Sequence, residues 1–231
     1  MMNFDCFEIL TFDCYGTLID WESGMLLALQ SILSAHQIQL DETSILEHFA
    51  KFESELEQGA YSKYRTILNG VVQRFGKEFK FNPSCAELNA LADSVKNWQP
   101  FSDTVEALKV LKQRFKLVII SNIDDDLFAF SAERLVIPFD LIVTAEQVKS
   151  YKPSLNNFNV AIQKLGVSPN KILHVAGSIY HDIIPATSMG LSTVWVNRRL
   201  GKHGSGAALP AQGQPTLEVP DLKTLASMVS G

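Results

Sequence analysis

The chain has few of the features that mark secreted or membrane-spanning proteins. Its 231 residues include only three cysteines, an odd number without metal-ligand spacing, so we expect a reduced, cytoplasmic setting. No apolar run approaches the roughly 20 residues that a membrane-spanning helix needs. The N-terminus carries Asp5 and Glu8 and no basic segment, so it does not read as a secretory signal.

An excess of positive charge is also absent, as are internal repeats and blocks of like charge. The formal net charge is -5, which argues against a general nucleic-acid binder and against an anionic membrane surface as partner. Hydrophobic residues make up 46% of the chain and charged residues 19%, as in soluble globular proteins. The length suffices for one core domain with a modest insertion.

Short apolar segments alternate with helical patterns near the N-terminus and in the C-terminal half. Such alternation is typical of parallel βαβ units, so we predict an α/β fold with a Rossmann-like parallel sheet core and helices on both faces. Residues 201–220 are rich in Gly, Ala, Pro and Gln, which predicts a long loop before a closing helix at 222–229. The expected strands are 7–12, 116–121, 140–145, 171–177 and 192–197.

Residues 21–98 show a different pattern, in which strand-like runs disappear and apolar residues recur at helical spacing. Asp41 and Thr43 are candidate N-caps, and Asn82-Pro83 is a candidate start of the last helix. We therefore predict an all-helical cap at 20–97, inserted between two segments of the core, 1–19 and 98–231.

Polar residues follow the ends of four predicted strands. In chain order they are Asp13, Ser121, Asn122, Lys152, Ser178 and Asp182. The carboxyl ends of parallel strands meet at one edge of a sheet, where α/β proteins bind ligands. At such an edge Asp13 can act as a nucleophile, and Lys152 can keep it ionised. Ser121 and Asn122 can donate hydrogen bonds to an anion, and Asp182 can orient Lys152 or a hydrolytic water.

Each of these residues also has an ordinary structural explanation. Asp13 and Ser121-Asn122 are typical turn residues, Lys152-Pro153 suits a solvated loop, and Asp182 suits a helix cap. Their occurrence at four successive strand ends favours an active site over four separate turns.

The residues at these strand ends resemble the four motifs of the haloacid dehalogenase (HAD) superfamily. Residues 13–18 (DCYGTL) are similar to the first motif, Ser121-Asn122 to the second, Lys152-Pro153 to the third, and residues 174–182 (HVAGSIYHD) to the fourth. The resemblance covers nearly the whole chain and includes the inserted helical cap. It implies that Asp13 is an aspartyl nucleophile on a Rossmann-like core, and as fold-level analogy it says less about the substrate.

Two positions distinguish the enzyme types of this superfamily. Its phosphatases have a second Asp two residues after the nucleophile and a Gly-Asp pair before the last acidic residue, where this chain has Tyr15 and Ala176-Gly177. The D-x-Y-G-T-L form resembles the metal-independent 2-haloacid dehalogenases. The resemblance therefore implies conversion of a small 2-halo carboxylic acid to a 2-hydroxy acid through an aspartyl ester, without a cofactor and without a metal site.

The candidate site residues follow from the strand ends and from this resemblance. The catalytic set is Asp13, Thr17, Lys152 and Asp182, and the substrate-binding set is Tyr15, Ser121, Asn122, Arg65 and Ser178. His181, beside Asp182, is a further candidate for water activation or anion binding.

The chain departs from the dehalogenase pattern at several positions that shape the substrate pocket. No arginine occurs early in the cap, where the nearest one is Arg65. Phe158 replaces a tyrosine, and Gly177 and Ile179 replace a serine and an asparagine of the fourth motif. We therefore expect an altered pocket around an intact nucleophile.

Two other functions stay open at this point. The first is Mg²⁺-dependent hydrolysis of small phosphate monoesters by the same nucleophile, with magnesium as cofactor. The second is a non-catalytic HAD-like scaffold that binds an anion or a protein partner, against which the joint presence of Asp13, Lys152 and Asp182 argues. If the protein is an enzyme of either type, we expect a small anionic substrate and neither nucleic acid nor a membrane as partner. Similar proteins suggest a homodimer formed through the cap.

Overall fold

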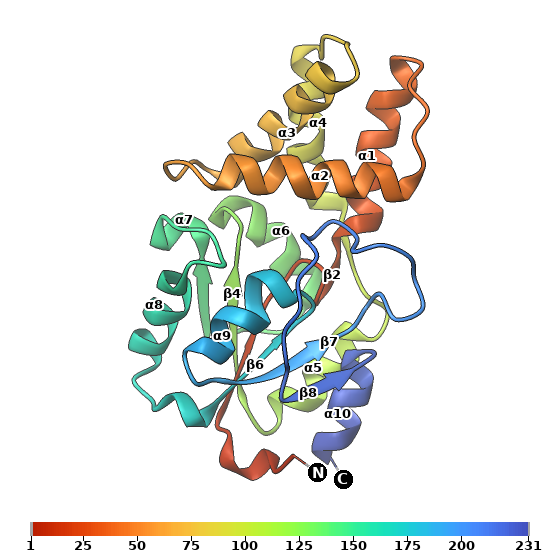
Figure 1. Ribbon diagram of the computed structural model, residues 1–231. Helices are drawn as coiled ribbons and strands as arrows, with labels where there is room; N and C mark the ends of the chain where they lie inside the picture. The colour runs from red at the N-terminus through yellow and green to blue at the C-terminus, as the bar shows by residue number, and fades with distance from the viewer. Residues whose placement is uncertain (1, 231) are drawn as a thin grey trace.

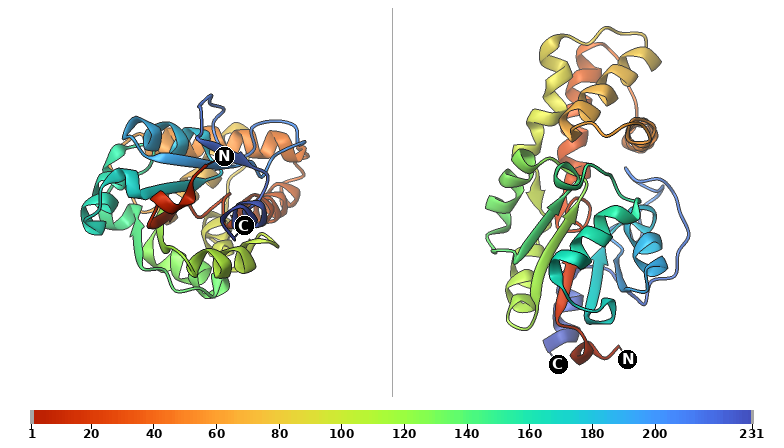
Figure 2. Two further views of the ribbon diagram at one scale, coloured as in Figure 1. Left: turned by 90° about the horizontal axis from the view of Figure 1, so that it is seen from below. Right: turned by 90° about the vertical axis from the view of Figure 1, so that its left-hand side faces the viewer.

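The computed structural model describes residues 2–230 as two stacked layers (Figure 1). A six-stranded sheet with helices on both faces forms the core, and a layer of helices lies above the carboxyl edge of that sheet. The two ends of the chain lie together at the far end of the core (Figures 1 and 2). This arrangement confirms the predicted α/β fold with a Rossmann-like parallel sheet and an inserted helical cap.

All neighbouring strands of the sheet are parallel, in the order β5-β4-β1-β6-β7-β8. In that order the strands span Leu141–Thr144, Lys116–Ser121, Ile9–Phe12, Ile172–Ala176, Ser192–Val196 and Leu217–Val219. β1 lies between β4 and β6, and its last residue, Phe12, pairs with Ile119 and Val175. Asp13 therefore leaves the sheet in the middle of its carboxyl edge.

Side chains of β1 alternate between the two faces of the sheet, as the period of a strand requires. On one face Ile9 belongs to a buried cluster that includes residues of α8 (Leu155–Leu165) and α9 (Ile184–Ser188). On the other face Leu10 and Phe12 belong to a larger cluster with α5 (Thr104–Lys112), α6 (Asp125–Leu135) and α10 (Leu222–Ser230). Full burial of such side chains stabilises the fold by roughly 1.5–3 kcal/mol each.

The cap consists of α1 (Trp21–Ala35), α2 (Glu42–Glu57), α3 (Tyr64–Glu78) and α4 (Cys85–Ser94). The N-caps Asp20, Asp41 and Ser84 each accept a hydrogen bond from the backbone N–H three residues later, which satisfies a free donor of the first turn. The apolar faces of the four helices join the larger core cluster. The cap is thereby attached to the core by continuous apolar packing.

Two short strands mark the places where the chain leaves and re-enters the core. β2 (Ile19–Asp20) and β3 (Gln99–Pro100) pair antiparallel, although the whole cap separates them in sequence. A single 3-10 turn, Val95–Asn97, connects α4 to β3. On this ground we propose 20–97 as the bounds of the cap, and 1–19 with 98–231 as the core.

Within the cap, the structure differs from the predicted helix starts at two places. The helix predicted from Asn82-Pro83 begins at Cys85, because Ser84 and Glu87 form a capping box there. The prediction of Thr43 as an N-cap is wrong, since Thr43 lies inside α2 and Asp41 caps that helix.

Within the core, the predicted loop at 201–220 contains β8, which extends the sheet by one strand. The prediction also lacks the short helix α7 (Ala145–Val148) and the π-helical turn η4 (Ile179–Ile183). Two further 3-10 turns span Phe4–Cys6 and Pro169–Lys171. Among these, η4 bears on the candidate site, because it carries the last four residues of the fourth motif, 179–182.

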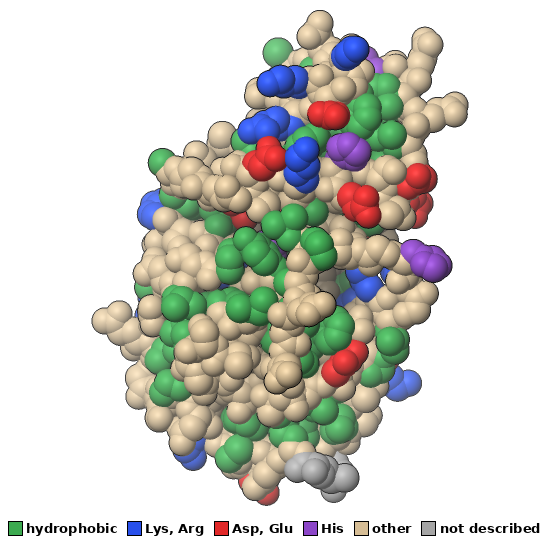
Figure 3. All heavy atoms as spheres, in the orientation of Figure 1, with side chains coloured by type: hydrophobic (Ala, Val, Ile, Leu, Met, Phe, Trp, Pro, Cys, Tyr) green, Lys and Arg blue, Asp and Glu red, His purple; other side chains and the backbone are tan. Residues whose placement is uncertain are grey.

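On the face shown in Figure 3, charged side chains of both signs are intermixed over the cap, and the core below carries mainly hydrophobic and uncharged groups. None of the helices in the described part of the chain is long and apolar enough to cross a membrane.

Gly24, inside α1, packs against the ring of Trp98. A Cβ at Gly24 would lie 2.1 Å from Cδ1 of Trp98, a ring that is only 1% exposed. Alanine raises helix propensity by about 1 kcal/mol over glycine, but overpacking of a buried ring costs about 1–3 kcal/mol. Since three ring atoms would lie within 2.7 Å of this Cβ, we expect a cost at the upper end of that range. Gly24→Ala should therefore lower the free energy of unfolding by about 1–2 kcal/mol in urea denaturation.

Gly59 provides the matched control, because a Cβ there would meet no atom within 4 Å. Gly59→Ala should unfold at the same urea concentration as the wild type. Equal stability of both variants would show that repacking of Trp98 costs no more than the helix propensity that alanine adds.

Candidate active site

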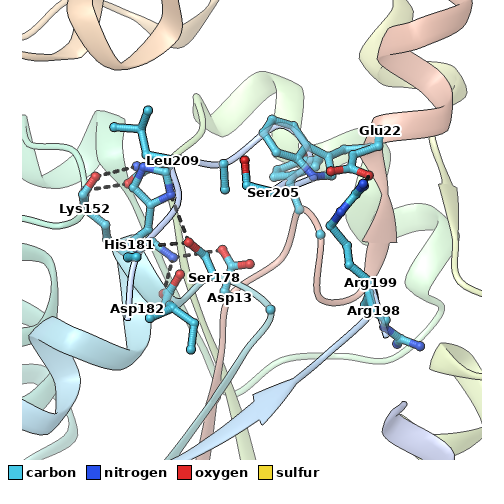
Figure 4. A pocket seen from close by; sticks show the side chains of 18 of the residues that line it. Asp13, Glu22, Lys152, Ser178, His181, Asp182, Arg198, Arg199, Ser205 and Leu209 are labelled. Atoms are coloured by element: carbon cyan, nitrogen blue, oxygen red, sulfur yellow. Dashed lines mark hydrogen bonds and ion pairs between the residues drawn. The ribbon is translucent and has the colours of Figure 1, made fainter. Parts of the chain in front are cut away.

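The side chains that follow β1, β4 and β6, together with Lys152 from the segment before α8, converge on one cavity at the carboxyl edge of the sheet (Figure 4). The cavity has a volume of about 490 Å³ and lies between the core and the cap. Asp13, Ser121, Lys152 and Asp182 line its floor. The structure thus brings together the strand-end residues that the sequence pattern singled out.

Lys152 is the centre of this group. Its Nζ donates hydrogen bonds to Asp13 Oδ1 at 2.8 Å, to Asp182 Oδ1 at 2.6 Å and to the carbonyl oxygen of Ile120 at 2.9 Å. All three protons of the ammonium therefore have an acceptor. Lys152 is only 1% exposed, and a charge this deeply buried is stable only when it is paired and hydrogen-bonded in this way.

The pKa values of the three groups reflect burial and mutual attraction. Burial disfavours the charged form of Lys152, but Asp13 and Asp182 outweigh it and raise the pKa of the ammonium. Burial raises the pKa of Asp13, and Lys152 only partly opposes that effect. Burial also raises the pKa of Asp182, but Lys152 and His174 outweigh this effect and lower the pKa to about 2. Asp182 is thus ionised at neutral pH, and of the two carboxylates Asp13 is the easier to protonate.

A buried hydrogen-bonded chain extends from this group into the sheet. His174 Nε2 lies 3.0 Å from Asp182 Oδ1, and His174 Nδ1 lies 2.9 Å from Oγ1 of Thr11 on the neighbouring strand. Both side chains are fully buried or nearly so. This chain fixes the orientation of Asp182. The sequence pattern did not indicate that His174 contacts Asp182, because a histidine inside an apolar strand is typical of a core residue.

The second oxygen of Asp13 is held by Thr17. The Thr17 hydroxyl donates to Asp13 Oδ2 at 2.6 Å and accepts from the backbone N–H of Gly177 at 2.8 Å. Arg198 donates to the carbonyl oxygen of Thr17 at 3.0 and 3.2 Å and pairs with Asp103 at 2.7 Å. The turn after β1 is therefore tied both to the end of β6 and to the segment after β7.

Asn122 and Ser121 have different roles in the structure. The Asn122 side chain accepts from the backbone N–H of Lys152 at 2.7 Å and donates to its carbonyl oxygen at 3.0 Å, so it positions the lysine segment. The Ser121 hydroxyl is fully buried and has no hydrogen-bond partner among the described residues, although Ser121 lines the cavity. Of the two, Ser121 is the one whose donor is free for a ligand.

Tyr15 lines the cavity, but its hydroxyl lies 2.8 Å from Ser131 Oγ, and its ring packs edge-on against Trp98. Ser178 also lines the cavity, and its hydroxyl accepts from the backbone N–H of His181 at 3.1 Å. Both side chains therefore reach the site with their hydroxyl groups already hydrogen-bonded.

Arg65 does not reach the site, contrary to the sequence expectation. Its guanidinium pairs with Asp93 of α4 at 3.0 Å and with Asp126 of α6 at 3.4 Å, and it is not among the residues that line the cavity. The cap instead presents Glu53 and Glu57 to the cavity. Burial raises the pKa of Glu53 to about 8, so this carboxyl is neutral at pH 7.

The loop after β7 closes the side of the cavity. Arg199 pairs with Glu22 of α1 at 2.5 Å, and Glu22 also accepts from the backbone N–H of Ala207 at 2.8 Å. Residues 208–211 of the same loop line the cavity. The partners of Arg198 and Arg199, Asp103 and Glu22, lie far away in the chain, so sequence patterns do not indicate these contacts.

The positions of the general acid and of one magnesium ligand in phosphatases of the superfamily do not fit those roles here. Tyr15 stands in place of the acid, and its hydroxyl is bound to Ser131. At Gly177 a Cβ would lie 2.4 Å from the carbonyl oxygen of Gly16, so no side chain fits. In the described part of the chain no group of three or more His, Cys, Asp or Glu side chains is placed to hold a metal ion.

A buried carboxylate nucleophile, a lysine and a second carboxylate below a helical cap define a hydrolase of the aspartate-nucleophile class. Residues 7–190 match the family of haloacid dehalogenase-like hydrolases, and the chain belongs to this family.

Known relatives include both enzyme types. The (S)-2-haloacid dehalogenase 4A of Burkholderia cepacia is 27% identical over 208 residues, which are 84% of this chain and 85% of that protein. The glyceraldehyde 3-phosphate phosphatase of Methanothermobacter thermautotrophicus is 31% identical over 108 residues, 44% of this chain and 46% of that protein.

Among solved structures, the L-2-haloacid dehalogenase of Xanthobacter autotrophicus with chloropropionic acid covalently bound has a TM-score of 0.77 at 20% identity. The likeness covers 97% of this chain and 99% of that one, and it shows that the two chains share their fold.

We expect Thr17→Val to destabilise the protein, because it leaves the Gly177 N–H and one Asp13 oxygen without a partner in a buried site. The loss should be about 1–3 kcal/mol in the free energy of unfolding, measured by urea denaturation. Thr17→Ser keeps the hydroxyl and should retain most of the stability. If the valine variant were as stable as the wild type, water would have to satisfy both groups.

Proposed function

We propose that this protein is a metal-independent (S)-2-haloacid dehalogenase that hydrolyses a small 2-halo carboxylic acid to a 2-hydroxy acid. One observation carries this proposal. Lys152 and Thr17 hold Asp13 in place by hydrogen bonds, as a nucleophile requires, while Tyr15 and Gly177 stand where a phosphatase has its general acid and a metal ligand. Halide leaves as a stable anion, so the reaction needs neither group.

In the first step a carboxylate oxygen of Asp13 attacks the α-carbon of the substrate from the side opposite the halogen. The C–halogen bond breaks, and the halide leaves with the bonding electrons. The product is an ester between Asp13 and the inverted α-carbon. The free hydroxyl of Ser121 is available to hold the substrate carboxylate, and Lys152 stabilises Asp13 as an anion until it attacks.

In the second step water attacks the carboxyl carbon of Asp13, loses a proton to a base, and releases the 2-hydroxy acid as the ester C–O bond breaks. The hydroxyl oxygen of the first product molecule comes from Asp13, and the water oxygen enters the Asp13 carboxylate. Asp182 keeps Lys152 in place throughout, since their ion pair does not depend on the charge of Asp13.

The partial match to a phosphatase supports one alternative, Mg²⁺-dependent hydrolysis of phosphate monoesters. The clash at Gly177 and the bound hydroxyl of Tyr15 count against it. A scaffold without turnover is a weaker alternative, because it gives no reason for a buried nucleophile paired with lysine.

The setting and assembly of the enzyme are part of the same proposal. Cys6, Cys14 and Cys85 are all free thiols, which supports a reducing, cytoplasmic location. We propose a small anion as the substrate, and a homodimer stays a prediction from similar proteins.

The decisive assay measures halide release from (S)-2-chloropropionate and haloacetates, and phosphate release from an aryl phosphate, each with magnesium and with chelator. We expect halide release that the chelator does not affect, and none from Asp13→Asn. Chelator-sensitive phosphate release without halide would refute the dehalogenase. In a single turnover in ¹⁸O-water, the label should appear in Asp13 and not in the product.

The pH profile tests the state of Asp13. Only the ionised carboxylate attacks, and burial raises its pKa above the ordinary value of 3.8. We therefore expect kcat/KM to fall as the pH drops through this raised pKa, at a higher pH than for an exposed aspartate. The Thr17 hydrogen bond lowers the pKa of Asp13. Thr17→Val should therefore shift the acid limb of the pH profile to higher pH, and Thr17→Ser should leave it in place. An acid limb at or below 3.8 would contradict the assignment.

A further inference from the structure

Two carboxyl groups of the cap line the cavity and have no role in the two steps above. Glu53 and Glu57 are four residues apart in α2, so they lie on the same side of that helix. Glu53 is only 6% exposed, and Glu57 is partly exposed. The positive charge of Lys152 lowers the pKa of Glu57, so the cap side and the floor of the cavity are close enough for their charges to interact.

Neither carboxyl group is paired with a cation. Within the part of the chain that the structure describes, no Lys, Arg or His side chain forms an ion pair with Glu53 or Glu57. Lys152, Arg198 and Arg199 also line the cavity, but each of them is already paired with another carboxylate. The pair is therefore not explained by the ion pairs that hold the rest of the site together.

The hydrogen bonding of the pair is also incomplete. The Tyr64 hydroxyl donates to Oε1 of Glu53 at 2.5 Å, and among the described residues neither carboxyl group has another hydrogen bond. Oε2 of Glu53 and both oxygens of Glu57 are thus without a donor. On the floor of the same cavity, the fully buried Ser121 hydroxyl is without a partner as well. Unpaired polar groups in a buried site are costly, so free groups at both ends of the cavity suit a ligand that is polar at both ends.

The two ends of the cavity suit different parts of a substrate. The Ser121 hydroxyl can donate to the substrate carboxylate, as described above. The oxygens of Glu53 and Glu57 are acceptors, so an alkyl group next to them would leave them unpaired, whereas a donor would satisfy them. The cavity volume of about 490 Å³ lies in the usual range of ligand pockets, about 300–1,000 Å³, and leaves room for such a group.

We propose that Glu53 and Glu57 determine the substrate class, which is a 2-halo carboxylic acid whose side chain carries a hydrogen-bond donor, either a hydroxyl or an ammonium group. This rests on the proposed dehalogenase function and leaves its two steps unchanged. Plain 2-haloalkanoates are then the poorer substrates, because their binding covers the two carboxyl groups without giving them a partner.

Three substrates of nearly equal shape test this inference. They are (S)-2-chlorobutanoate, (S)-2-chloro-3-hydroxypropanoate and (S)-3-amino-2-chloropropanoate, which carry a methyl, a hydroxyl and an ammonium group at the same place. The measurement is kcat/KM for halide release at pH 7, compared between substrates on one protein preparation, so that the folded fraction cancels. We expect the wild type to favour a donor substrate over the alkyl substrate by about 10–100-fold. Preference for the hydroxyl would assign neutral carboxyl groups to the pair, and preference for the ammonium group an ionised one.

Variants of α2 show whether the preference comes from the pair. Glu57→Leu removes a carboxyl group that has no hydrogen bond in the described structure, and it should lower the preference to about threefold or less. Glu53→Gln keeps an acceptor for Tyr64 and should retain any preference for the hydroxyl substrate. Glu55→Leu is the matched control, because Glu55 lies on the same helix, pairs with Arg74 and does not line the cavity. It should keep the wild-type preference.

The inference and the proposed function fail in different ways. Equal kcat/KM for the three substrates in the wild type would overturn the inference and leave the dehalogenase in place. The inference would also fail if Glu57→Leu kept the wild-type preference, or if it lost the same factor on all three substrates, since the carboxyl group would then act on the shared reaction. Halide release from none of the three substrates would refute the proposed function, and the inference with it.

Discussion

The ammonium of Lys152 is the charge on which both the fold and the chemistry depend. It is enclosed by Asp13, Asp182 and the carbonyl oxygen of Ile120, which come from the ends of β1, η4 and β4. Loss of one partner from a buried ion pair typically costs about 3–5 kcal/mol, so these chain segments are held at fixed distances. The same contact lowers the pKa of Asp13 and so partly opposes the effect of burial, which raises it. Structural order at this edge and readiness of the nucleophile therefore have one cause.

The pattern of short apolar strands and the polar residues behind them sufficed to predict the sheet, the cap and the meeting of Asp13, Lys152 and Asp182. These features depend on local periodicity and on the shared edge of parallel strands. β8 was missed because it has only three residues and follows a loop rich in glycine and proline. Arg65 and Tyr15 were assigned to the substrate, but distant acceptors such as Asp126 and Ser131 determine where their side chains point.

The cap side of the cavity departs most from the expectation of an anion-binding arginine. Glu53 accepts from the Tyr64 hydroxyl at 2.5 Å, and burial raises its pKa to about 8. A neutral carboxyl does not repel an anionic substrate at pH 7, although it would do so once ionised. The charged group of the cap that lines the cavity beside Glu53 and Glu57 is Glu22, and it is paired with Arg199.

Gly177 also limits how this protein can change in evolution. The end of β6 passes so close to the Gly16 carbonyl that a Cβ would lie 2.4 Å from it. A single codon change that introduced aspartate there would disrupt the turn that carries Asp13, before any metal could bind. A change to phosphatase chemistry would need a simultaneous shift of the backbone at Gly16 and at Gly177. Single substitutions selected one after another do not produce such a shift. The cap and residues 208–211 also line the cavity, so substitutions there can change the shape of the pocket while the contacts of Asp13 stay in place.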